Sequence, residues 1–155
     1  MHIEYDEAAD LDDLYQQMIL DHSRSPRNFG AMDDATGSSV GHNPLCGDRL
    51  TVFAKVRGDR VEDVRFTGKG CAICVASASL MTEAIKGRSP VAAQALFDQF
   101  HQLLTRPNDD TPAALDKLIV FEGVRKYPIR VKCATLPWHT MKAALEAPDR
   151  TVSTE

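Results

Sequence analysis

The spacing of apolar residues predicts several amphipathic helices. After Asp10, which is suited to cap a helix, apolar side chains recur at i, i+3, i+4, i+7 and i+8 through Ile19. Gly87 is a natural residue to follow a helix end, and Ser89-Pro90 is typical of an N-cap followed by the first residue of the next helix. We expect helices over about residues 10–20, 71–86, 90–105, 111–123 and 134–147.

Alternation of apolar and polar residues predicts strands between the first helix and the second. Residues 50–56 and 61–66 alternate on either side of Arg57-Gly58-Asp59-Arg60, which is typical of a hairpin turn. Residues 35–42 are a weaker candidate for an edge strand. We also expect residues 127–132 to be extended, because a proline disfavours helical backbone at the residue before it.

The order of these elements predicts an α+β fold, with a three-stranded antiparallel sheet and helices packed against it. At 155 residues the chain is long enough for a substantial hydrophobic core. We expect a single domain over residues 1–155, with its core at about residues 10–147. The N-terminal leader and the polar tail after Pro148 are expected to be flexible.

Charge and composition narrow the classes of partner and the cellular location. A net charge of −4 with no basic run argues against nucleic-acid binding. The sequence shows neither a secretory signal nor an apolar run of membrane-spanning length, so we expect a cytoplasmic protein with no membrane partner. Thiols stay reduced in the cytoplasm, and the four cysteines are therefore expected to bind a metal or to react rather than form disulfides.

The sequence Asn43-Pro44-Leu45-Cys46-Gly47-Asp48 places a thiol and a carboxylate two residues apart. In extended or turned backbone these two side chains point to the same side, and Gly47 permits a tight turn between them. A thiolate beside a carboxylate is a suitable pair of ligands for zinc or iron. Two ligands do not hold a metal, so the others must come from elsewhere in the chain.

Cys71 and Cys133 occupy matching positions, since each follows a predicted extended segment and opens a predicted helix. The free N–H groups and the macrodipole of a helix N-terminus stabilise a thiolate. If these element ends meet at one edge of the sheet, Cys46, Asp48, Cys71 and Cys133 form a four-ligand site of tetrahedral type. The spacing alone is weak evidence for such a site, because it is not a paired CxxC pattern.

Three other residues leave alternatives open. Cys74 forms a CxxC pair with Cys71 and is either the fourth thiolate of a Cys₄ zinc site or a small buried helix residue. A redox pair is disfavoured, because no βαβ unit surrounds it. We interpret His22 as an end-of-helix or loop histidine rather than a ligand. Arg130, three residues before Cys133, either projects toward the site or is an ordinary solvated cation.

Several motifs in combination resemble one known family. They are Leu14-Tyr15, Ile19-Leu20-Asp21-His22, Pro26-Arg27-Asn28, Gly30, the sequence 43–48, Phe66, Gly68-Lys69-Gly70-Cys71-Ala72-Ile73, Ala76-Ser77-Ala78-Ser79-Leu80-Met81 and Arg130-Val131-Lys132-Cys133-Ala134-Thr135-Leu136. From about residue 11 to residue 147 the chain is similar to the SufU branch of the IscU/NifU-type iron–sulfur assembly proteins. The chain lacks the L-P-P-V-K motif and the histidine that precede the last cysteine in scaffold-type IscU, and residues 88–123 hold additional helix. Both features favour SufU.

The resemblance implies an IscU-like fold and a zinc ion bound by Cys46, Asp48, Cys71 and Cys133. It also implies that the chain accepts sulfur from a SufS-type cysteine desulfurase, whose PLP belongs to that partner. A downstream Suf-type cluster scaffold is the expected recipient. Cys74 departs from the family pattern, in which a serine or a similar small residue stands at this position. Its thiol is therefore a further candidate ligand.

As a sulfurtransferase, the chain is expected to act through Cys46. A zinc-bound thiolate is deprotonated but a poor nucleophile, so one ligand has to leave the metal, and Cys46 lies on a loop. The resemblance implies that a partner histidine then replaces Cys46 on zinc. Asp48 would keep hold of the metal, and Arg130 would steady the thiolate or persulfide charge. Two alternatives stay open, a scaffold that assembles a [2Fe–2S] cluster on the same four residues and a structural-zinc adaptor without sulfur chemistry.

Overall fold

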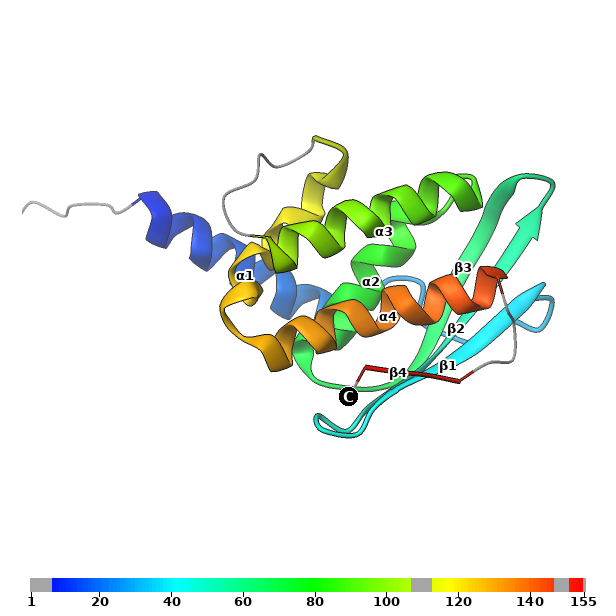
Figure 1. Ribbon diagram of the computed structural model, residues 1–155, viewed down its shortest axis with the longest axis horizontal. Coiled ribbons are helices and arrows are strands. Elements are labelled where there is room, and N and C mark those ends of the chain that lie inside the picture. The colour runs from blue at the N-terminus through cyan, green and yellow to red at the C-terminus, as the bar shows by residue number, and fades with distance from the viewer. Residues whose placement is uncertain (1–6, 107–112, 147–150, 155) are drawn as a thin grey trace, which may run out of the picture.

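The computed structural model describes residues 7–106, 113–146 and 151–154, and it confirms the α+β class (Figure 1). The elements are α1 (Glu7–Arg24), β1 (Gly37–Asn43), β2 (Asp48–Arg57), β3 (Arg60–Lys69), α2 (Ala72–Ile85), α3 (Pro90–Thr105), the 3₁₀ segment η1 (Ala113–Lys126), α4 (Pro128–Glu146) and β4 (Thr151–Ser153). The first helix therefore begins before the predicted cap at Asp10. The rest of the predicted leader and most of the loop after Arg106 lie outside the described residues.

The described sheet has four strands, in the order β3-β2-β1-β4, rather than the predicted three. β1, β2 and β3 form the predicted antiparallel meander, and β4 pairs in parallel with β1. The prediction of a flexible tail is therefore wrong for residues 151–153, and β1 is not an edge strand. Two of the three residues of β4 are exposed, so its side chains provide no burial pattern from which a strand could be predicted. The strand is formed by backbone pairing.

β1 is hard to predict because its buried face carries small and polar residues. These buried positions are Gly37, Ser39, Gly41 and Asn43. A β-carbon at position 41 would collide with the side chain of Thr140 in α4, so glycine is what lets α4 pack closely on β1. This contact brings the helix that carries Cys133 next to the strand that leads to Cys46.

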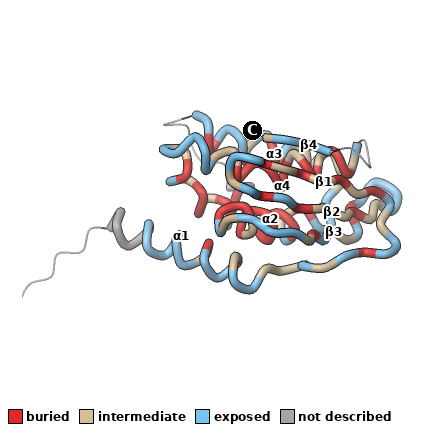
Figure 2. Tube along the Cα trace, turned by 90° about the horizontal axis from the view of Figure 1, so that it is seen from below, coloured by how far each residue is buried: buried red, intermediate tan, exposed pale blue. Residues whose placement is uncertain are grey.

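The helices cover one face of the sheet, with α4 over β1 and β2, α2 beside it, and α3 packed on α4 and η1 (Figures 1 and 2). Trp138 of α4 is fully buried and stacks on Phe97 and Phe100 of α3, with ring centroids 5.8 and 5.0 Å apart. Its indole N–H donates to Ser77 Oγ at 3.2 Å, and that hydroxyl donates to the Ala134 carbonyl. These contacts hold together α2 and α4, the helices associated with Cys71 and Cys133.

The predicted boundaries of α2 and α3 are confirmed. Cys71 is the N-cap of α2, and Gly87, with φ of +88°, follows its C-cap. Ser89 caps α3 by accepting the backbone N–H of Ala92 at 3.0 Å, and Pro90 is the first residue of that helix. The ends of these two helices depend on the backbone preferences of single residues, so the sequence alone is enough to predict them.

The start of α4 differs from the prediction. This helix begins at Pro128, so the extended segment expected over residues 127–132 is wrong, and Cys133 does not open the helix. Tyr127 is non-helical, as expected before a proline, but proline itself is favoured at the first helical position. The short helix predicted over residues 111–123 is a 3₁₀ segment that continues to Lys126 and is kinked at Asp116.

None of the helices in the described ranges combines the length and the apolar composition needed to cross a membrane.

Candidate metal centre

The turn between β1 and β2 presents Cys46 and Asp48 together, as the sequence predicts. Asn43, the last residue of β1, pairs with Asp48, the first residue of β2. The backbone N–H of Cys46 donates to the Asn43 carbonyl at 3.3 Å, and Gly47 takes a φ of +72° that favours glycine. Cys46 is partly exposed on this turn, whereas Asp48 is fully buried.

Asp48 contacts Cys71 at the start of α2. Its Oδ1 accepts the backbone N–H of Cys71 at 2.8 Å, and its Oδ2 lies 3.8 Å from the Cys71 sulfur. A β-carbon on Gly70 would lie 3.0 Å from Asp48 Oδ1 and 3.2 Å from the sulfur of Cys74. The chain can therefore approach the carboxylate this closely because residue 70 has no side chain.

Cys133 reaches the same place from the second turn of α4 and not from a helix start. Its sulfur lies 3.0 Å from the sulfur of Cys46. Among the described residues, Cys46, Asp48 and Cys133 form the one group of Cys, His, Asp or Glu side chains whose potential ligand atoms all lie within 4.8 Å of one another. Cys71 adjoins this group through its contacts with Asp48 and Cys133.

The donor chemistry of these four residues suits a zinc ion. Three thiols and one carboxylate match the sulfur and oxygen ligands that Zn²⁺ takes in tetrahedral sites. Asp48 is 0% exposed and lies among thiols, with the Cys71 N–H as its hydrogen-bond donor. A buried carboxylate in such surroundings is stabilised by a cation, because burial of a charge is unfavourable unless it is paired.

The two cysteines beside Asp48 differ in acidity. A hydrogen bond from the Cys133 thiol lowers the pKa of Cys71 to about 7, although burial opposes the shift. Backbone N–H groups of Cys74 and Ile73 at the start of α2 act in the same direction as that hydrogen bond. The pKa of Cys133 is raised, first because its thiol donates to Cys71 and then because it is buried. A metal ion that binds here therefore has to displace the Cys133 proton.

Cys74 and His22 lie in the core. Cys74 is 2% exposed, and burial is the main reason that its pKa is raised. Its position favours the interpretation as a small buried helix residue over a Cys₄ zinc site. His22 lies in the last turn of α1, where its Nδ1 is 2.7 Å from Ser79 Oγ. It is a buried structural histidine, and the metal-binding group described above does not include it.

The structure does not bring Arg130 to the cluster. The side chain is exposed in the first turn of α4, and its guanidinium carbon lies 5.5 Å from the centroid of the Tyr127 ring. It lines a cavity of about 220 Å³ between α1 and η1, together with Tyr15 and Ile73. No hydrogen bond or ion pair among the described residues joins Arg130 to the cluster, so its catalytic role stays a prediction.

Sequence reasoning missed Asn43, whose side chain is 0% exposed. Its Oδ1 accepts the backbone N–H of Leu45 at 3.1 Å, and its Nδ2 lies 3.7 Å from the sulfur of Cys46. An asparagine before a proline, three residues ahead of a candidate ligand, is a signal for a side-chain-stabilised turn. That signal predicts the turn but not the contact with sulfur.

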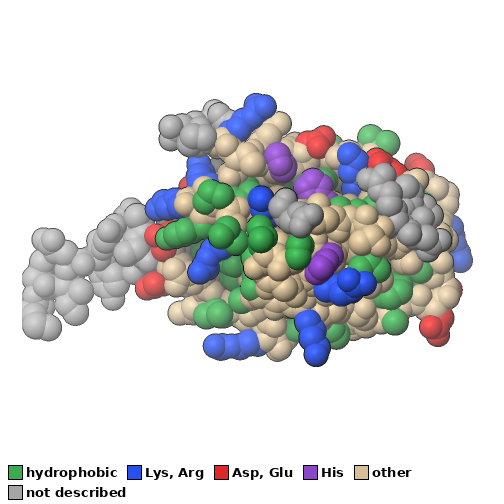
Figure 3. Space-filling view, turned by 60° about the horizontal axis from the view of Figure 1, so that its bottom comes forward, with side chains coloured by type: hydrophobic (Ala, Val, Ile, Leu, Met, Phe, Trp, Pro, Cys, Tyr) green, Lys and Arg blue, Asp and Glu red, His purple; other side chains and the backbone are tan. Residues whose placement is uncertain are grey.

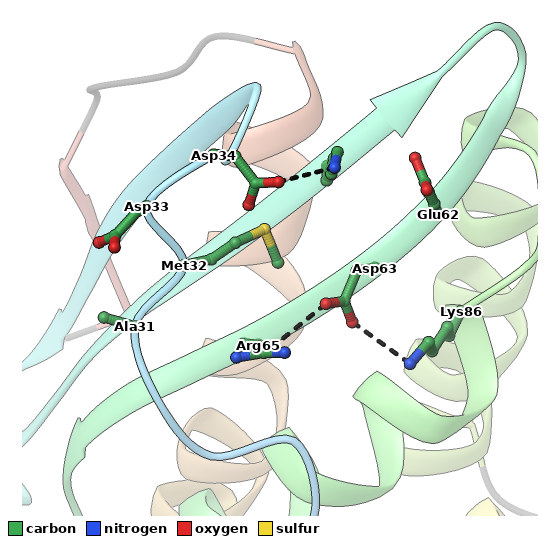
Figure 4. Close-up of a pocket in the computed structure, with 9 residues that line it drawn as sticks. Ala31, Met32, Asp33, Asp34, Glu62, Asp63, Arg65 and Lys86 are labelled. Atoms are coloured by element: carbon green, nitrogen blue, oxygen red, sulfur yellow. Dashed lines mark hydrogen bonds and ion pairs between the residues drawn. The ribbon is translucent and has the colours of Figure 1, made fainter.

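A groove of about 460 Å³ lies along the β2–β3 hairpin and is lined mainly by charged side chains (Figure 4). In it Asp63 pairs with Arg65 at 3.2 Å and with Lys86 at 3.4 Å, while Asp34 pairs with Lys55 at 2.7 Å. These charges offset one another, and its described lining contains no cysteine. We therefore place the candidate functional site at the cysteine cluster and not in this groove.

Comparison with known proteins gives consistent matches over most of the chain. Residues 14–134 match the family model of the NifU-like N-terminal domain. The chain is 42% identical over 134 residues to the zinc-dependent sulfurtransferase SufU of Bacillus subtilis, a match that covers 86% of this chain and 90% of that protein. It is 36% identical over 136 residues to the iron–sulfur cluster assembly scaffold protein IscU of Streptococcus pyogenes, covering 88% and 85% of the two chains.

A solved structure shows the same arrangement of elements. It is that of a proposed iron–sulfur cluster assembly scaffold protein for the SUF system from Fervidobacterium islandicum, FiSufU. The TM-score is 0.78 at 34% identity, and the match covers 84% of this chain and 95% of that one. The matched range 14–134 includes all four residues of the cluster. The chain therefore belongs to the NifU-like N-terminal domain family of iron–sulfur cluster assembly proteins, in its SufU branch.

Proposed function

We propose that this chain is a zinc-dependent sulfurtransferase that accepts persulfide sulfur from a SufS-type cysteine desulfurase for iron–sulfur cluster assembly. The observation that carries the proposal is the position of Cys46. Its sulfur lies 3.0 Å from that of Cys133, yet the residue is partly exposed on a turn. Cys46 is thus both part of the cluster and, on its turn, accessible to a partner. The similarity to SufU of Bacillus subtilis supports the same activity.

Cys46, Asp48, Cys71 and Cys133 are the residues proposed to hold the zinc ion. When bound, the ion would keep its thiolate ligands deprotonated at neutral pH. Asp48 is fixed by the N–H of Cys71. Cys71 is the N-cap of α2 and Cys133 lies within α4, whereas Cys46 lies on the turn between β1 and β2. These three residues are the fixed part of the site, and Cys46 is the exchangeable part.

The proposed reaction is an exchange at the sulfur of Cys46. The Cys46 thiolate attacks the terminal sulfur of the partner's cysteine persulfide and forms a new S–S bond. The bond between that terminal sulfur and the partner's cysteine breaks, and the partner's cysteine leaves as a thiolate. Cys46 then carries the persulfide, and no external oxidant or reductant is needed. The PLP that generates the original persulfide belongs to the desulfurase.

Arg130 is proposed to stabilise negative charge on Cys46 or on its persulfide. It lies one turn before Cys133 in α4, and its side chain is exposed. To reach the cluster it has to leave the face of the Tyr127 ring. That movement requires little free energy, since an exposed cation–π contact is worth about 0.5–1 kcal/mol.

Exposed apolar side chains that are close in sequence to the cysteines of the cluster support docking of a protein partner. Leu45, Tyr127 and Ile129 are 66%, 56% and 58% exposed, and they lie close in sequence to Cys46 or Cys133. Figure 3 shows hydrophobic side chains gathered among basic ones at the end of the molecule from which α1 projects. Such patches mark interaction sites. We infer that the desulfurase docks here, that a Suf-type cluster scaffold receives the sulfur, and that the exchange takes place in the cytoplasm.

A second candidate function is that of a scaffold on which a [2Fe–2S] cluster is assembled and transferred. The observation that favours it is the donor set itself, because Cys46, Cys71 and Cys133 provide three thiols and iron–sulfur clusters are held mainly by thiolates. The similarity to IscU of Streptococcus pyogenes, named as a scaffold protein, points the same way.

Metal analysis and a desulfurase assay together test the proposal. We expect purified protein to be colourless with one tightly bound zinc, and to increase alanine formation by a SufS-type desulfurase. Cys46→Ala should abolish the increase, whereas Cys74→Ala, a matched change of a cysteine outside the cluster, should retain it. A brown protein with iron and acid-labile sulfide supports the scaffold instead. Full stimulation by Cys46→Ala would overturn the assignment of Cys46 as sulfur acceptor.

A further inference from the structure

Asn43 makes three hydrogen bonds within the turn that carries Cys46. Its Oδ1 accepts the N–H of Leu45 at 3.1 Å, and its backbone carbonyl accepts the N–H of Cys46 at 3.3 Å. Its side-chain Nδ2 donates to the sulfur of Cys46 at 3.7 Å. The first two bonds close the turn in the way that asparagine commonly does. The third reaches the proposed sulfur acceptor itself.

The side-chain amide of Asn43 is shielded from water, so its hydrogen-bond acceptors have to come from the protein. The side chain is 0% exposed, and buried polar groups are nearly always hydrogen-bonded. Among the described residues, the acceptor that the structure gives to Nδ2 is the Cys46 sulfur. A sulfur that carries negative charge accepts such a bond more strongly than a neutral one. The contact therefore gains in strength when Cys46 is a thiolate.

Cys46 differs in its surroundings from the other two cysteines of the cluster. Cys71 is the N-cap of α2, and backbone N–H groups at the start of that helix lower the pKa of its thiol. Cys133 is 1% exposed within α4. Cys46 instead lies on a short turn, and its sulfur accepts hydrogen bonds from the Cys133 thiol and from the side chain of Asn43, which organises the turn.

We propose that Asn43 is a positioning residue that makes Cys46 the exchangeable ligand of the site. The proposal rests on the proposed function, in which Cys46 leaves the zinc to accept sulfur. A hydrogen bond to a metal-bound sulfur withdraws electron density from it and weakens its bond to the ion. The same N–H provides the sulfur with a polar partner after it leaves, so the turn does not have to rearrange.

Two substitutions separate the sulfur contact from the turn. In Asn43→Ser the hydroxyl can still accept the N–H of Leu45, but it is too short to reach the sulfur of Cys46. Asn43→Ala removes both bonds. Ser39→Ala is the matched control, because Ser39 is buried on the same face of β1 and its hydroxyl has no hydrogen-bond partner among the described residues.

The first measurement uses Co²⁺ alone as a probe of the site. A hydrogen bond to a thiolate ligand lowers the energy of the sulfur lone pairs, so its loss should move the sulfur-to-cobalt charge-transfer absorption to longer wavelength. We expect this shift in Asn43→Ser with an unchanged absorption intensity, which reports the number of thiolate ligands. Ser39→Ala should give the spectrum of the unmutated chain. An unshifted spectrum for Asn43→Ser overturns the proposal.

The second measurement compares sulfur acceptance with zinc retention. In Asn43→Ser we expect the maximal stimulation of the desulfurase to fall about tenfold, the scale of the loss typical when a residue that supports a metal ligand is changed. The concentration for half-maximal stimulation should not change, because the docking surface is intact. Zinc should be retained against a chelator at least as tightly as in the unmutated chain.

These readouts distinguish positioning from simple damage to the fold. If Asn43→Ser loses zinc and stimulation together, Asn43 is a structural residue of the turn and the proposal is wrong. Asn43→Ala shows how large that structural effect is, and thermal unfolding of each variant confirms that it is folded. If the unmutated chain fails to stimulate the desulfurase, the proposed function fails, while the cobalt spectra and zinc retention still decide the role of Asn43.

Discussion

The backbone N–H of Cys71 donates to the buried carboxylate of Asp48 at 2.8 Å, and this bond joins the first residue of β2 to the N-cap of α2. The other carboxylate oxygen of Asp48 lies 3.8 Å from the Cys71 sulfur. One oxygen is thus held by the backbone while the other faces the thiols. Two candidate ligands from distant parts of the sequence are aligned by the protein itself.

Substitutions of Asp48 should separate its two roles. Asp48→Asn keeps an oxygen that can accept the Cys71 N–H but loses the negative charge, so we expect a folded protein with zinc affinity reduced by at least about tenfold. Asp48→Ala also leaves the Cys71 N–H without its acceptor, which should lower the free energy of unfolding by a further about 1–3 kcal/mol. Chelator competition and urea unfolding measure the two effects. Equal stability of the two variants would show that the hydrogen bond contributes little.

The cysteines associated with helices should account for zinc-dependent stability. Cys71→Ser or Cys133→Ser should lose zinc, and removal of the metal with a chelator should no longer change the thermal unfolding temperature, because structural zinc contributes folding free energy directly. Cys74→Ala is the control, since it is buried outside the metal-binding group and should keep both zinc and the chelator response. Loss of zinc in Cys74→Ala would instead place that sulfur among the ligands.

The parts of the fold that were predicted correctly depend on preferences of single residues. Gly87 and Ser89-Pro90 mark helix ends through backbone geometry and capping, and Cys46 and Asp48 share a side because of the local turn. The start of α4 differs from the expectation because proline restricts the residue before it, whereas Pro128 itself is favoured as the first residue of a helix.

The parts that the sequence predicts weakly or not at all depend on contacts between distant segments. β1 carries Gly37, Ser39, Gly41 and Asn43 on its buried face, and the need for glycine at position 41 arises from its close contact with Thr140 of α4. β4 is formed by pairing with β1 and leaves no pattern of its own. The approach of the Cys133 sulfur to Cys46 depends in the same way on how α4 packs on the sheet.

Acid should destabilise the protein through His22. Burial, and then the positive charge of Arg27, lower the pKa of this histidine below 6.5, while Glu83 opposes the shift. The unfolded chain therefore binds the proton first as the pH falls. The corresponding stability is fully present above about pH 6.5 and is lost as the pH falls toward the lowered pKa.

Replacement of this histidine should reduce the pH dependence. We expect His22→Gln to show a smaller decrease in the free energy of unfolding between about pH 7.5 and about pH 5.5, measured by urea titration at each pH. The decrease should not vanish, because burial also lowers the pKa of His139. An identical decrease in the variant and the unmutated chain would show that His22 does not titrate in this range.

Deletion of residues 147–155 should expose the edge of β1. In the intact chain β4 pairs with β1 at three positions, from Val40 with Thr151 to His42 with Ser153. Thr154 extends this contact, since its N–H donates to the His42 carbonyl at 3.2 Å and its hydroxyl to the Lys132 carbonyl at 3.4 Å. The deletion removes these bonds, each with a net value of about 0.5–1.5 kcal/mol, so we expect a loss of about 1–3 kcal/mol in the free energy of unfolding.

The deletion should also promote association of the protein with itself, because an open strand edge offers unpaired N–H and C=O groups to another chain. Size-exclusion chromatography over a range of concentrations measures this effect, and urea unfolding measures the loss of stability. Removal of residue 155 alone is the matched control, since it leaves β4 and Thr154 in place. If the longer deletion unfolds at the same urea concentration as this control and elutes at the same volume, β4 neither stabilises the sheet nor protects its edge.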